Sequence, residues 1–378
     1  MTDPTATERS ALTRAVAVAA ARRPCASPNP TVGCTVLDEH EVLGSGTSEP
    51  AGGRHAEVAA LAEAGERARG ATAVITLEPC AHHGRTPPCT EALLGADIAR
   101  VVFARTDPNP LATGGARAMR AAGIEVIGPL VPDDLLARAV DLELAGTGTT
   151  HRLGRPFVTL KLAQRSDGGL VATDGSRWIT GARARLAVHR DRDRVDAVLV
   201  GVGTVLADDP LLDARDLDVS APDGIPVLPR PPRAVVLDSE ARTPPSARVV
   251  RPGSLLLVAP DAPVERVALL RGGGASLREV PRGPGGLDPV AALGVLVEEG
   301  ITTVLAEPGP TLAASLMAAG LVDRLVLHVA GSAPDVVVPA LALDGWRLVR
   351  RGGAGPDRII ELVRRDVGPH AVAIPEAA

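Results

Sequence analysis

The apolar residues of the chain follow two spacings, one helical and one strand-like. Leu12, Val16 and Ala19 fall on one face of a helix that runs to about residue 23, and Thr5 with Glu8 forms a capping-box pattern at its start. Downstream, the pattern predicts a hairpin at 32–43, helices at 55–64, 89–94 and 116–122, and strands at 73–77, 100–104 and 124–127. Strands that alternate with helices indicate a sheet covered by helices on both faces.

The alternation stops and then restarts. We expect a helix at 133–144, followed by a linker at 145–150, where the residues are small and polar. The second half predicts strands at 157–162, 197–200, 234–237, 255–258, 303–306 and 325–329, and helices at 181–190, 290–299 and 312–319. A proline cluster at 226–232 and a glycine-rich stretch at 271–286 are interpreted as surface loops. The chain is therefore expected to hold two α/β domains, at 1–146 and 155–378.

Charge and hydropathy exclude several classes of partner. The chain has 40 Lys and Arg against 45 Asp and Glu, so its bulk charge offers no polyanion-binding face and we expect no nucleic-acid partner. It has no apolar run of about 18 residues, and its start lacks the pattern of a secretory signal. We therefore expect a cytoplasmic protein with no membrane partner.

Four cysteines, Cys25, Cys34, Cys80 and Cys89, all lie in the first quarter of the chain. A large chain without a secretory signal favours metal ligation or buried thiols over disulfides. Cys34 falls in an apolar strand and is interpreted as core, and Cys25 as a loop residue.

One constellation carries chemistry. His55 and Glu57 open a predicted helix, and Cys80 and Cys89, each preceded by proline, follow a predicted strand. One histidine and two cysteines match a catalytic zinc site, in which three protein ligands leave a position for water. Glu57 is then available to move protons. The pattern is that of zinc nucleobase deaminases, with eight residues between the cysteines instead of two.

A structural zinc site remains as an alternative. Such a site takes four protein ligands, and His82 or His83 would have to be the fourth. The protein would then be a binding module and not an enzyme.

The second half gives weaker signals. Gly201 and Gly203 follow an apolar strand, but Leu206 stands where a dinucleotide fingerprint needs its third glycine. The turn at 307–311 leads into a helix whose N-terminal N–H groups suit a cofactor pyrophosphate. Arg192 and Arg215 are either phosphate ligands or solvated surface residues.

Three stretches, at 28–34, 55–58 and 76–89, resemble the bifunctional deaminase/reductase family of riboflavin biosynthesis, and the ending Thr86-Pro87-Pro88-Cys89 is specific to it. A fourth stretch, 107–110, continues the match. The resemblance implies a cytidine-deaminase-like α/β/α domain followed by a dihydrofolate-reductase-like α/β domain. It implies that zinc is bound by His55, Cys80 and Cys89, that Glu57 is the proton shuttle, and that Asn29 orients the pyrimidine.

By the same resemblance, the deaminated substrate is a diaminopyrimidine that carries a ribosylamino phosphate. His82, His83 and Arg85 either contact its phosphate or cap their loop. Cytidine or tRNA is disfavoured as substrate, since the cysteine loop is long and the chain has no basic tract.

Stretches around 161–163, 176–180, 201–210, 238–239 and 309–312 resemble the reductase domain of that family. This likeness implies NADPH-dependent hydride transfer to the ribosyl C1′, which opens the sugar to a ribityl chain, in a homo-oligomer (dimer or tetramer). The implied NADPH-binding residues are Ala163, Trp178, Thr204, Asp208, Ser239, Gly309, Pro310, Thr311, Leu312, Ala313, Ala314 and Ser315. The implied substrate-binding residues are Asn29 in the first domain and Ser176, Arg192, Leu212, Arg215 and Glu307 in the second.

The chain also departs from the family pattern. The segment Arg165-Ser166 replaces a usual Ser-Leu or Thr-Leu and so puts a charge where a small polar residue is usual, Pro308 replaces a usual Gly or Ala, and the stretch 330–335 differs. These departures flank the proposed cofactor pocket. They motivate a second hypothesis, an active deaminase joined to a degenerate reductase that has only a structural role.

Overall fold

A computed structural model describes residues 3–21, 25–130, 145–170, 178–215, 231–331 and 345–365. The chain forms two compact units, and the division between them falls between Arg152 and Leu153. The predicted helix at 133–144 and most of the proline cluster at 226–232 lie outside the described residues.

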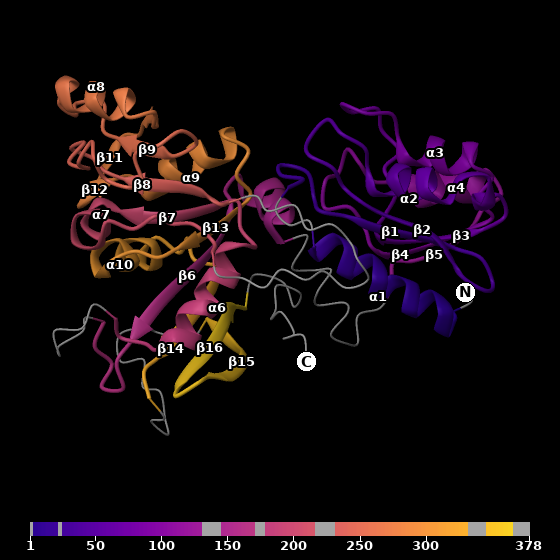
Figure 1. The fold of residues 1–378 in the computed structure, drawn as a ribbon. Helices are drawn as coiled ribbons and strands as arrows, with labels where there is room; N and C mark the ends of the chain where they lie inside the picture. The colour runs from indigo at the N-terminus through magenta and orange to yellow at the C-terminus, as the bar shows by residue number, and fades with distance from the viewer. Residues whose placement is uncertain are drawn as a thin grey trace. The chain divides into compact units, whose positions relative to one another are not determined.

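The first unit is built on a five-stranded mixed sheet in the order β2-β1-β3-β4-β5 (Figure 1). β1 is antiparallel to both β2 and β3, and β3, β4 and β5 are parallel to one another. Its elements are α1 (Ala6–Ala20), β1 (Gly33–Leu37), β2 (Val42–Thr47), α2 (Ala56–Ala64), a 3-10 turn (Gly65–Ala68), β3 (Thr72–Leu77), α3 (Cys89–Gly95), β4 (Arg100–Arg105), α4 (Gly115–Ala121) and β5 (Glu125–Ile127).

Helices cover both faces of this sheet, as the sequence predicts. α1 packs through Leu12 and Val16 against Val102 on one face. On the other face, α2, α3 and α4 bury a second cluster that includes Leu93 of α3 and Phe103 of β4. The packing of helices on each face of the sheet removes apolar side chains from water, and this burial is the main favourable term in folding.

The predicted capping box at the start of α1 is confirmed. The Glu8 N–H donates to Thr5 Oγ1 over 3.2 Å, and the Thr5 N–H donates to Glu8 Oε2 over 2.7 Å. These bonds satisfy two of the N–H groups that a helix start leaves without an intrahelical partner.

The second unit contains a nine-stranded sheet in the order β10-β9-β8-β7-β13-β6-β14-β16-β15 and a separate two-stranded ribbon, β11-β12. The first seven strands in this order, β10, β9, β8, β7, β13, β6 and β14, pair with their neighbours in parallel. The last two, β16 and β15, extend the sheet in antiparallel pairing. Its strands are β6 (Phe157–Gln164), β7 (Ala197–Gly201), β8 (Arg233–Leu237), β9 (Leu255–Val258), β10 (Ser276–Glu279), β11 (Arg282–Gly283), β12 (Gly286–Leu287), β13 (Thr303–Ala306), β14 (Arg324–Val329), β15 (Trp346–Ala354) and β16 (Asp357–Arg364).

The helices of this unit again cover two faces of the sheet. They are α6 (Ala182–Arg192), α7 (Val202–Asp208), α8 (Val264–Gly272), α9 (Pro289–Glu298) and α10 (Pro310–Ala318). α9 and α10 contribute Leu293 and Leu316 to one core cluster, whereas α7 and α8 contribute Val205 and Leu270 to another.

The sequence interpretation was wrong at two places. Residues 145–153 are helical instead of a linker, and Thr147 and Thr149 are buried. The stretch 271–286 contains β10, β11 and β12 instead of being a surface loop. Both segments are rich in glycine and small polar residues, whose intrinsic preference for helix or strand is weak. Burial of Thr147 and Thr149 overrides this preference in the first segment, and the pairing of β10 with β9 overrides it in the second.

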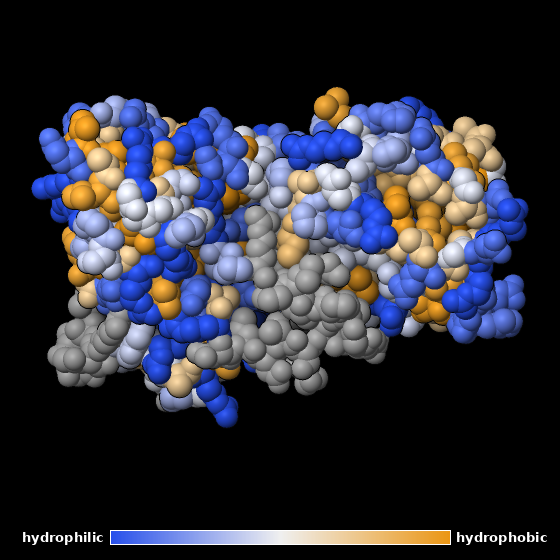
Figure 2. Space-filling view, turned by 45° about the horizontal axis from the view of Figure 1, so that its top comes forward, coloured by the Kyte–Doolittle hydropathy of each residue, from blue (hydrophilic) through white to orange (hydrophobic). Residues whose placement is uncertain are grey.

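Single apolar side chains remain exposed on separate elements, and Figure 2 shows hydrophobic patches between hydrophilic side chains on the face it presents. Examples are Leu94 of α3, Val264 of α8 and Val290 of α9. Isolated exposure of this kind is ordinary. Within the described ranges, none of the helices has the length and apolar character needed to cross a membrane.

Candidate functional site

The start of α2 presents two of the predicted functional residues. His55 is the N-cap residue of α2 and Glu57 is the second residue of the helix. Glu57 is buried, with only 4 % of its surface exposed. A carboxylate in the first turn interacts favourably with the helix dipole, so this position suits Glu57 although it lies out of water.

The two cysteines come from the loop between β3 and α3. Cys80 lies three residues beyond β3, and Cys89 is the first residue of α3. The Cys89 N–H donates to Cys80 Sγ over 3.3 Å, and both the N–H and the hydroxyl of Thr90 donate to the Cys80 carbonyl over 3.3 Å. The start of α3 therefore holds the Cys80 segment directly.

A carboxylate anchors the other side of this segment. Glu78 is buried, and its Oε1 accepts hydrogen bonds from the N–H groups of Gly114 and Ala116 at the start of α4. Gly115, between them, approaches Pro79 so closely that a built Cβ would lie 1.8 Å from the Pro79 carbonyl oxygen. The backbone before Cys80 is thus fixed between β3 and α4.

His55, Cys80 and Cys89 converge. Their ligand atoms all lie within 4.8 Å of one another. Nδ1 of His55 is 3.1 Å from Cys89 Sγ and 3.7 Å from Cys80 Sγ. One imidazole nitrogen and two thiol sulfurs, largely shielded from solvent, form a donor set that suits zinc.

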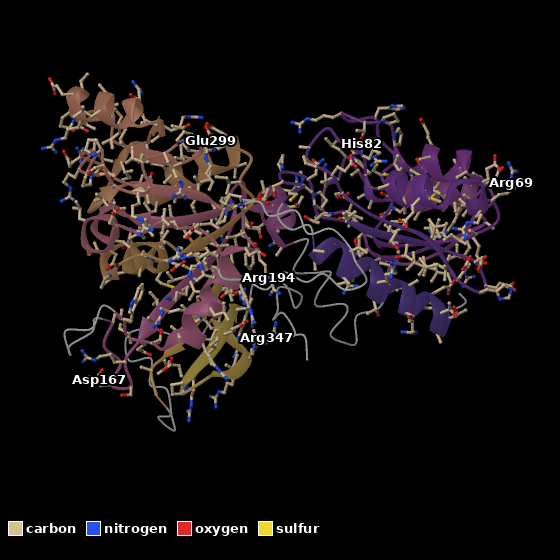
Figure 3. All side chains as sticks on the ribbon, in the orientation of Figure 1. Arg69, His82, Asp167, Arg194, Glu299 and Arg347 are labelled. Atoms are coloured by element: carbon tan, nitrogen blue, oxygen red, sulfur yellow. The ribbon has the colours of Figure 1, made fainter. Side chains whose placement is uncertain are left out.

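The same group bears on the structural-zinc alternative. Among the residues that the structure describes, the metal-binding group contains three side chains and neither His82 nor His83. His83 Nε2 instead lies 3.0 Å from Glu91 Oε1 of α3, which fits the loop-capping role. His82, labelled in Figure 3, is half-buried in the same loop. Three ligands favour a catalytic over a structural zinc site.

Electrostatics around the group favour one thiolate. Hydrogen bonding from Cys89 and from His55 lowers the pKa of Cys80 to about 4. The same hydrogen bond to Cys80, together with burial, raises the pKa of Cys89. Burial raises the pKa of Glu57 above its usual range. A buried carboxyl with a raised pKa is suited to take up and release protons.

Two other residues of the first unit were named by the sequence. Asn29 is half-buried, and its N–H donates to the Ala26 carbonyl over 3.0 Å. Asp107 had no assigned role, but charge interactions link it to His55, His82 and Cys80, and burial raises its pKa. The sequence marked the stretch 107–110 only as part of the family resemblance. It did not indicate that the Asp107 carboxylate interacts with His55 and Cys80.

In the second unit, predicted cofactor residues gather where parallel strands end. Gly309 caps the start of α10, and a Cβ built on it would lie 4.0 Å from Thr204 Oγ1 in α7. A Cβ built on Gly201, at the end of β7, would lie 3.5 Å from Leu312 in α10. The start of α7 and the start of α10 are therefore neighbours, an arrangement that suits phosphate binding.

The remaining predicted cofactor residues are dispersed over several elements. Ala163 lies in β6, Asp208 ends α7, and Ser239 follows β8. Trp178 is 52 % exposed, and the Arg185 guanidinium lies 5.2 Å from its ring centroid.

The predicted substrate residues Arg192 and Glu307 form an ion pair. Arg192 Nε donates to Glu307 Oε1 over 2.6 Å and Nη2 to Oε2 over 3.1 Å, and each side chain is 13 % exposed. Burial opposes ionisation of Glu307, but Arg192 and Lys161 outweigh it and lower the Glu307 pKa. The pair is therefore held in its charged form.

Asp213 brings further substrate residues together. Its carbonyl accepts hydrogen bonds from Arg192 Nη1 and His189 Nδ1, each over 3.1 Å, and its carboxylate pairs with Arg215. Leu212, beside it, is buried and has a positive φ of 54°. Ser176 lies outside the described residues.

Sequence reasoning gave Lys161 no role. It lies in β6, and burial lowers the pKa of its amino group. The negative charge of Glu307 offsets only part of this lowering. A charged residue within the mostly apolar strand predicted at 157–162 was the signal in the sequence that could have identified it.

The unusual Arg165 is accounted for locally. Its Nε donates to Asp167 Oδ1 over 2.9 Å, and its N–H donates to the Gly169 carbonyl, which closes the turn after β6. Asp167, labelled in Figure 3, lies in the middle of this turn. The added charge is paired within its own turn, so it gives no support to a degenerate reductase. Residues 332–335 of the other departure lie outside the described ranges.

Two family descriptions match this chain. Residues 6–105 match the cytidine and deoxycytidylate deaminase zinc-binding region, and residues 156–333 match the RibD C-terminal domain. The matches correspond to the two compact units and to the two groups of site residues.

Relatives cover nearly the whole chain. The riboflavin biosynthesis protein RibD of Escherichia coli is 39 % identical over 329 residues, 84 % of this chain and 86 % of that protein. RibD of Mycobacterium tuberculosis is 37 % identical over 349 residues, 89 % and 92 % of the two chains.

Solved structures agree. RibD of Acinetobacter baumannii superimposes with a TM-score of 0.77 at 32 % identity, covering 94 % of this chain and 98 % of that one. A diaminohydroxyphosphoribosylaminopyrimidine deaminase/5-amino-6-(5-phosphoribosylamino)uracil reductase from Thermotoga maritima gives 0.76 at 28 % identity, with the same coverage.

Fold, metal-binding group and matches together define a bifunctional enzyme of riboflavin biosynthesis, a zinc-dependent deaminase joined to an NADPH-dependent reductase. The chain belongs to the RibD family. Nothing in the described residues favours the degenerate-reductase alternative.

Proposed function

We propose that His55, Cys80 and Cys89 hold the zinc of the deaminase, and that Glu57 is its proton shuttle. The observation that carries the proposal is the convergence of the three ligand atoms within 4.8 Å, beside a buried carboxyl of raised pKa. Zinc held there supplies a Lewis acid that makes water a nucleophile near neutral pH.

Glu57 performs the proton transfers in this scheme. Deamination adds water to the ring carbon that bears the amino group and releases ammonia. The Glu57 carboxylate takes a proton from the attacking water and returns it to the leaving nitrogen, so that it ends in its starting state. Burial of the side chain keeps bulk water from competing for that proton. Asn29 orients the pyrimidine ring in the same proposal.

We assign the reductase site to the carboxyl ends of β6, β7, β8 and β13. NADPH supplies the hydride that the ribosyl C1′ receives. The N–H groups of Thr311 and Leu312, in the first turn of α10, and the Thr204 hydroxyl bind the cofactor phosphates, whereas Pro310 has no N–H and the Ala313 N–H already donates to the Gly309 carbonyl. Gly309, Pro310, Ala313, Ala314 and Ser315 line the same part of the site. Ala163, Trp178, Asp208 and Ser239 line the rest of the cofactor site.

The substrate side of the reductase contains Arg192, Leu212, Arg215, Glu307 and Ser176. Arg192 and Arg215 are both held by Asp213, through its carbonyl and its carboxylate respectively. Their planar guanidinium groups can donate two hydrogen bonds each to a phosphate. Glu307, held ionised by Arg192, accepts hydrogen bonds from the sugar hydroxyls. We further propose domains at 1–146 and 155–378, a cytoplasmic location and a homo-oligomer.

Glu57→Gln in the full chain tests the deaminase assignment. We expect ammonia release to fall about 10²–10⁴-fold, because the general acid–base is lost. Zinc content should stay near the wild-type level, and reduction of the deaminated intermediate should be unchanged. Glu66→Gln, an exposed glutamate just beyond α2, is the matched control and should be neutral. Deamination by Glu57→Gln at the wild-type rate would refute the assignment.

A further inference from the structure

The two ring nitrogens of His55 make different contacts. Nδ1 faces the thiols, at 3.1 Å from Cys89 Sγ and 3.7 Å from Cys80 Sγ. Nε2 points the opposite way and lies 3.0 Å from the Thr86 hydroxyl oxygen. The imidazole is thus held between the proposed metal ligands on one side and Thr86 on the other.

This arrangement has a chemical consequence for metal binding. A neutral imidazole has one N–H, so a nitrogen that binds a metal leaves the proton on the other nitrogen. A hydrogen-bond acceptor at that second nitrogen fixes the tautomer and the plane of the ring. The lone pairs of a threonine hydroxyl can accept such a bond.

The position of Thr86 is itself fixed by its loop. Its carbonyl accepts a hydrogen bond from the Gly84 N–H over 3.2 Å. Pro87 and Pro88 follow it, and Pro88 is the N-cap residue of α3, directly before Cys89. Proline restricts φ and donates no backbone hydrogen bond, so Thr86 is tied at short range to a metal-ligand position.

We propose that Thr86 is a positioning residue for the zinc ligand His55. Its hydroxyl accepts a hydrogen bond from Nε2–H of His55 and keeps Nδ1 directed at Cys80 and Cys89. The inference rests on the proposed zinc ligation. It gives a purpose to the eight-residue spacing of the cysteines, since a two-residue spacing has no room for such a residue.

The test compares Thr86→Val with Thr86→Ser in the full chain. Valine keeps the shape of the side chain and removes the hydroxyl, whereas serine keeps the hydroxyl and removes the methyl group. Zinc affinity is measured by competition with a chelator, and Co²⁺ substitution gives an absorption spectrum of the ligand field. Reduction of the deaminated intermediate reports folding of the rest of the chain.

We expect Thr86→Val to weaken zinc binding about 10–100-fold and to alter the Co²⁺ spectrum. Thr86→Ser should bind zinc close to the wild-type level. Thr13→Val is the matched control, because it removes an exposed hydroxyl that bonds to the Arg9 carbonyl in α1. It should leave zinc affinity unchanged. All three variants should retain reduction.

Two results would overturn the inference. One is wild-type zinc affinity in Thr86→Val, and the other is an equal loss in Thr86→Ser, which would indicate packing of the methyl group. His55→Ala, measured in parallel, separates this failure from failure of the zinc assignment. If His55→Ala also binds zinc normally, the ligation itself is wrong.

A measurement on the wild-type protein stands in if Thr86→Val does not fold. In the zinc-loaded chain with ¹⁵N-labelled histidine, the His55 signal, assigned through its change in Thr86→Ser, should show the proton on Nε2. A proton on Nδ1 would contradict the proposal.

Discussion

The Arg192–Glu307 pair shows how single residues set the chemistry of the second unit. Two hydrogen bonds join the side chains, and each is largely removed from water. A two-point pair of this kind fixes both planar groups in one geometry. Loss of one partner leaves the other charged in a poorly solvated place.

Glu307→Gln should therefore impair reduction selectively. We expect the kcat/KM for the deaminated intermediate to fall at least about tenfold, since a charge-assisted bond contributes about 1.5–3 kcal/mol. The KM for NADPH and the rate of deamination should be unchanged. Steady-state kinetics with each substrate varied in turn measures this.

Glu298→Gln is the control for that variant. Glu298 pairs with Arg278 at the surface, and both side chains are substantially exposed. Exposed pairs contribute about 0–1 kcal/mol, so both activities and the melting temperature should stay near wild type. Wild-type reduction by Glu307→Gln would remove Glu307 from the proposed substrate site.

At the scale of elements, the packing of α2 on β2 places His55 and Glu57. A Cβ built on Gly46 would lie 2.3 Å from the Ala56 carbonyl oxygen, and one on Gly44 would lie 2.4 Å from that of Ala60. Because both glycines lack a side chain, the helix backbone rests directly on the strand. The start of α2 is thereby fixed where its residues meet the cysteine loop.

Gly46→Ala should displace the start of α2. The added methyl group would meet the Ala56 carbonyl oxygen at 2.3 Å, the Ala60 nitrogen at 2.4 Å and the Ala59 Cβ at 2.8 Å, and because none of these atoms can rotate away, the helix must shift. We expect weaker zinc binding, a loss of deamination of tenfold or more and a destabilisation of about 1–3 kcal/mol in the first unit. Zinc competition and thermal unfolding measure these effects, and reduction should persist.

Gly95→Ala is the matched substitution for Gly46→Ala. A Cβ at Gly95, at the end of α3, meets no atom within 4 Å. It should preserve zinc affinity and deamination. An equal effect of the two substitutions would show that close packing on β2 does not position the site.

The elements also show where local patterns succeed. Strongly apolar strands such as β7 and β9 are confirmed within one residue of the predicted ends, and the capped start of α1 is confirmed, whereas the helix predicted to run to about residue 23 ends at Ala20. α7 and α8 were not predicted. α7 has only seven residues and begins in a glycine turn, and the propensity signal of so short a helix is weak beside its packing against the sheet.

On the scale of the whole molecule, each unit has its own apolar clusters. The clusters around Phe103 and Val102 contain only residues of the first unit, and those around Leu293 and Leu270 only residues of the second. A unit with its own core can keep its fold when a site in the other is altered.

Removal of zinc from the full chain should thus separate the two activities. After chelation, ammonia release should be lost, whereas NADPH-dependent reduction of the deaminated intermediate should remain within about twofold of the untreated enzyme. Added Zn²⁺ should restore deamination. Parallel loss of both activities at every chelator concentration would contradict the independence of the sites.

The amino-acid sequence by itself determined the residue types of the site and most elements that carry them. The histidine, the glutamate two positions later and the proline-preceded cysteines are local patterns, and the order of strands and helices follows from periodicity. These features depend only on neighbours along the chain.

Tertiary structure alone decided which distant groups meet. His55 lies 34 positions from Cys89 and 31 from Thr86, and Arg192 lies 115 from Glu307. Such contacts depend on sheet order, on the close approach of α2 to β2 and on the loop that leads into α3. No periodicity encodes these arrangements, because many chain segments compete for each packing position and only the complete fold selects one.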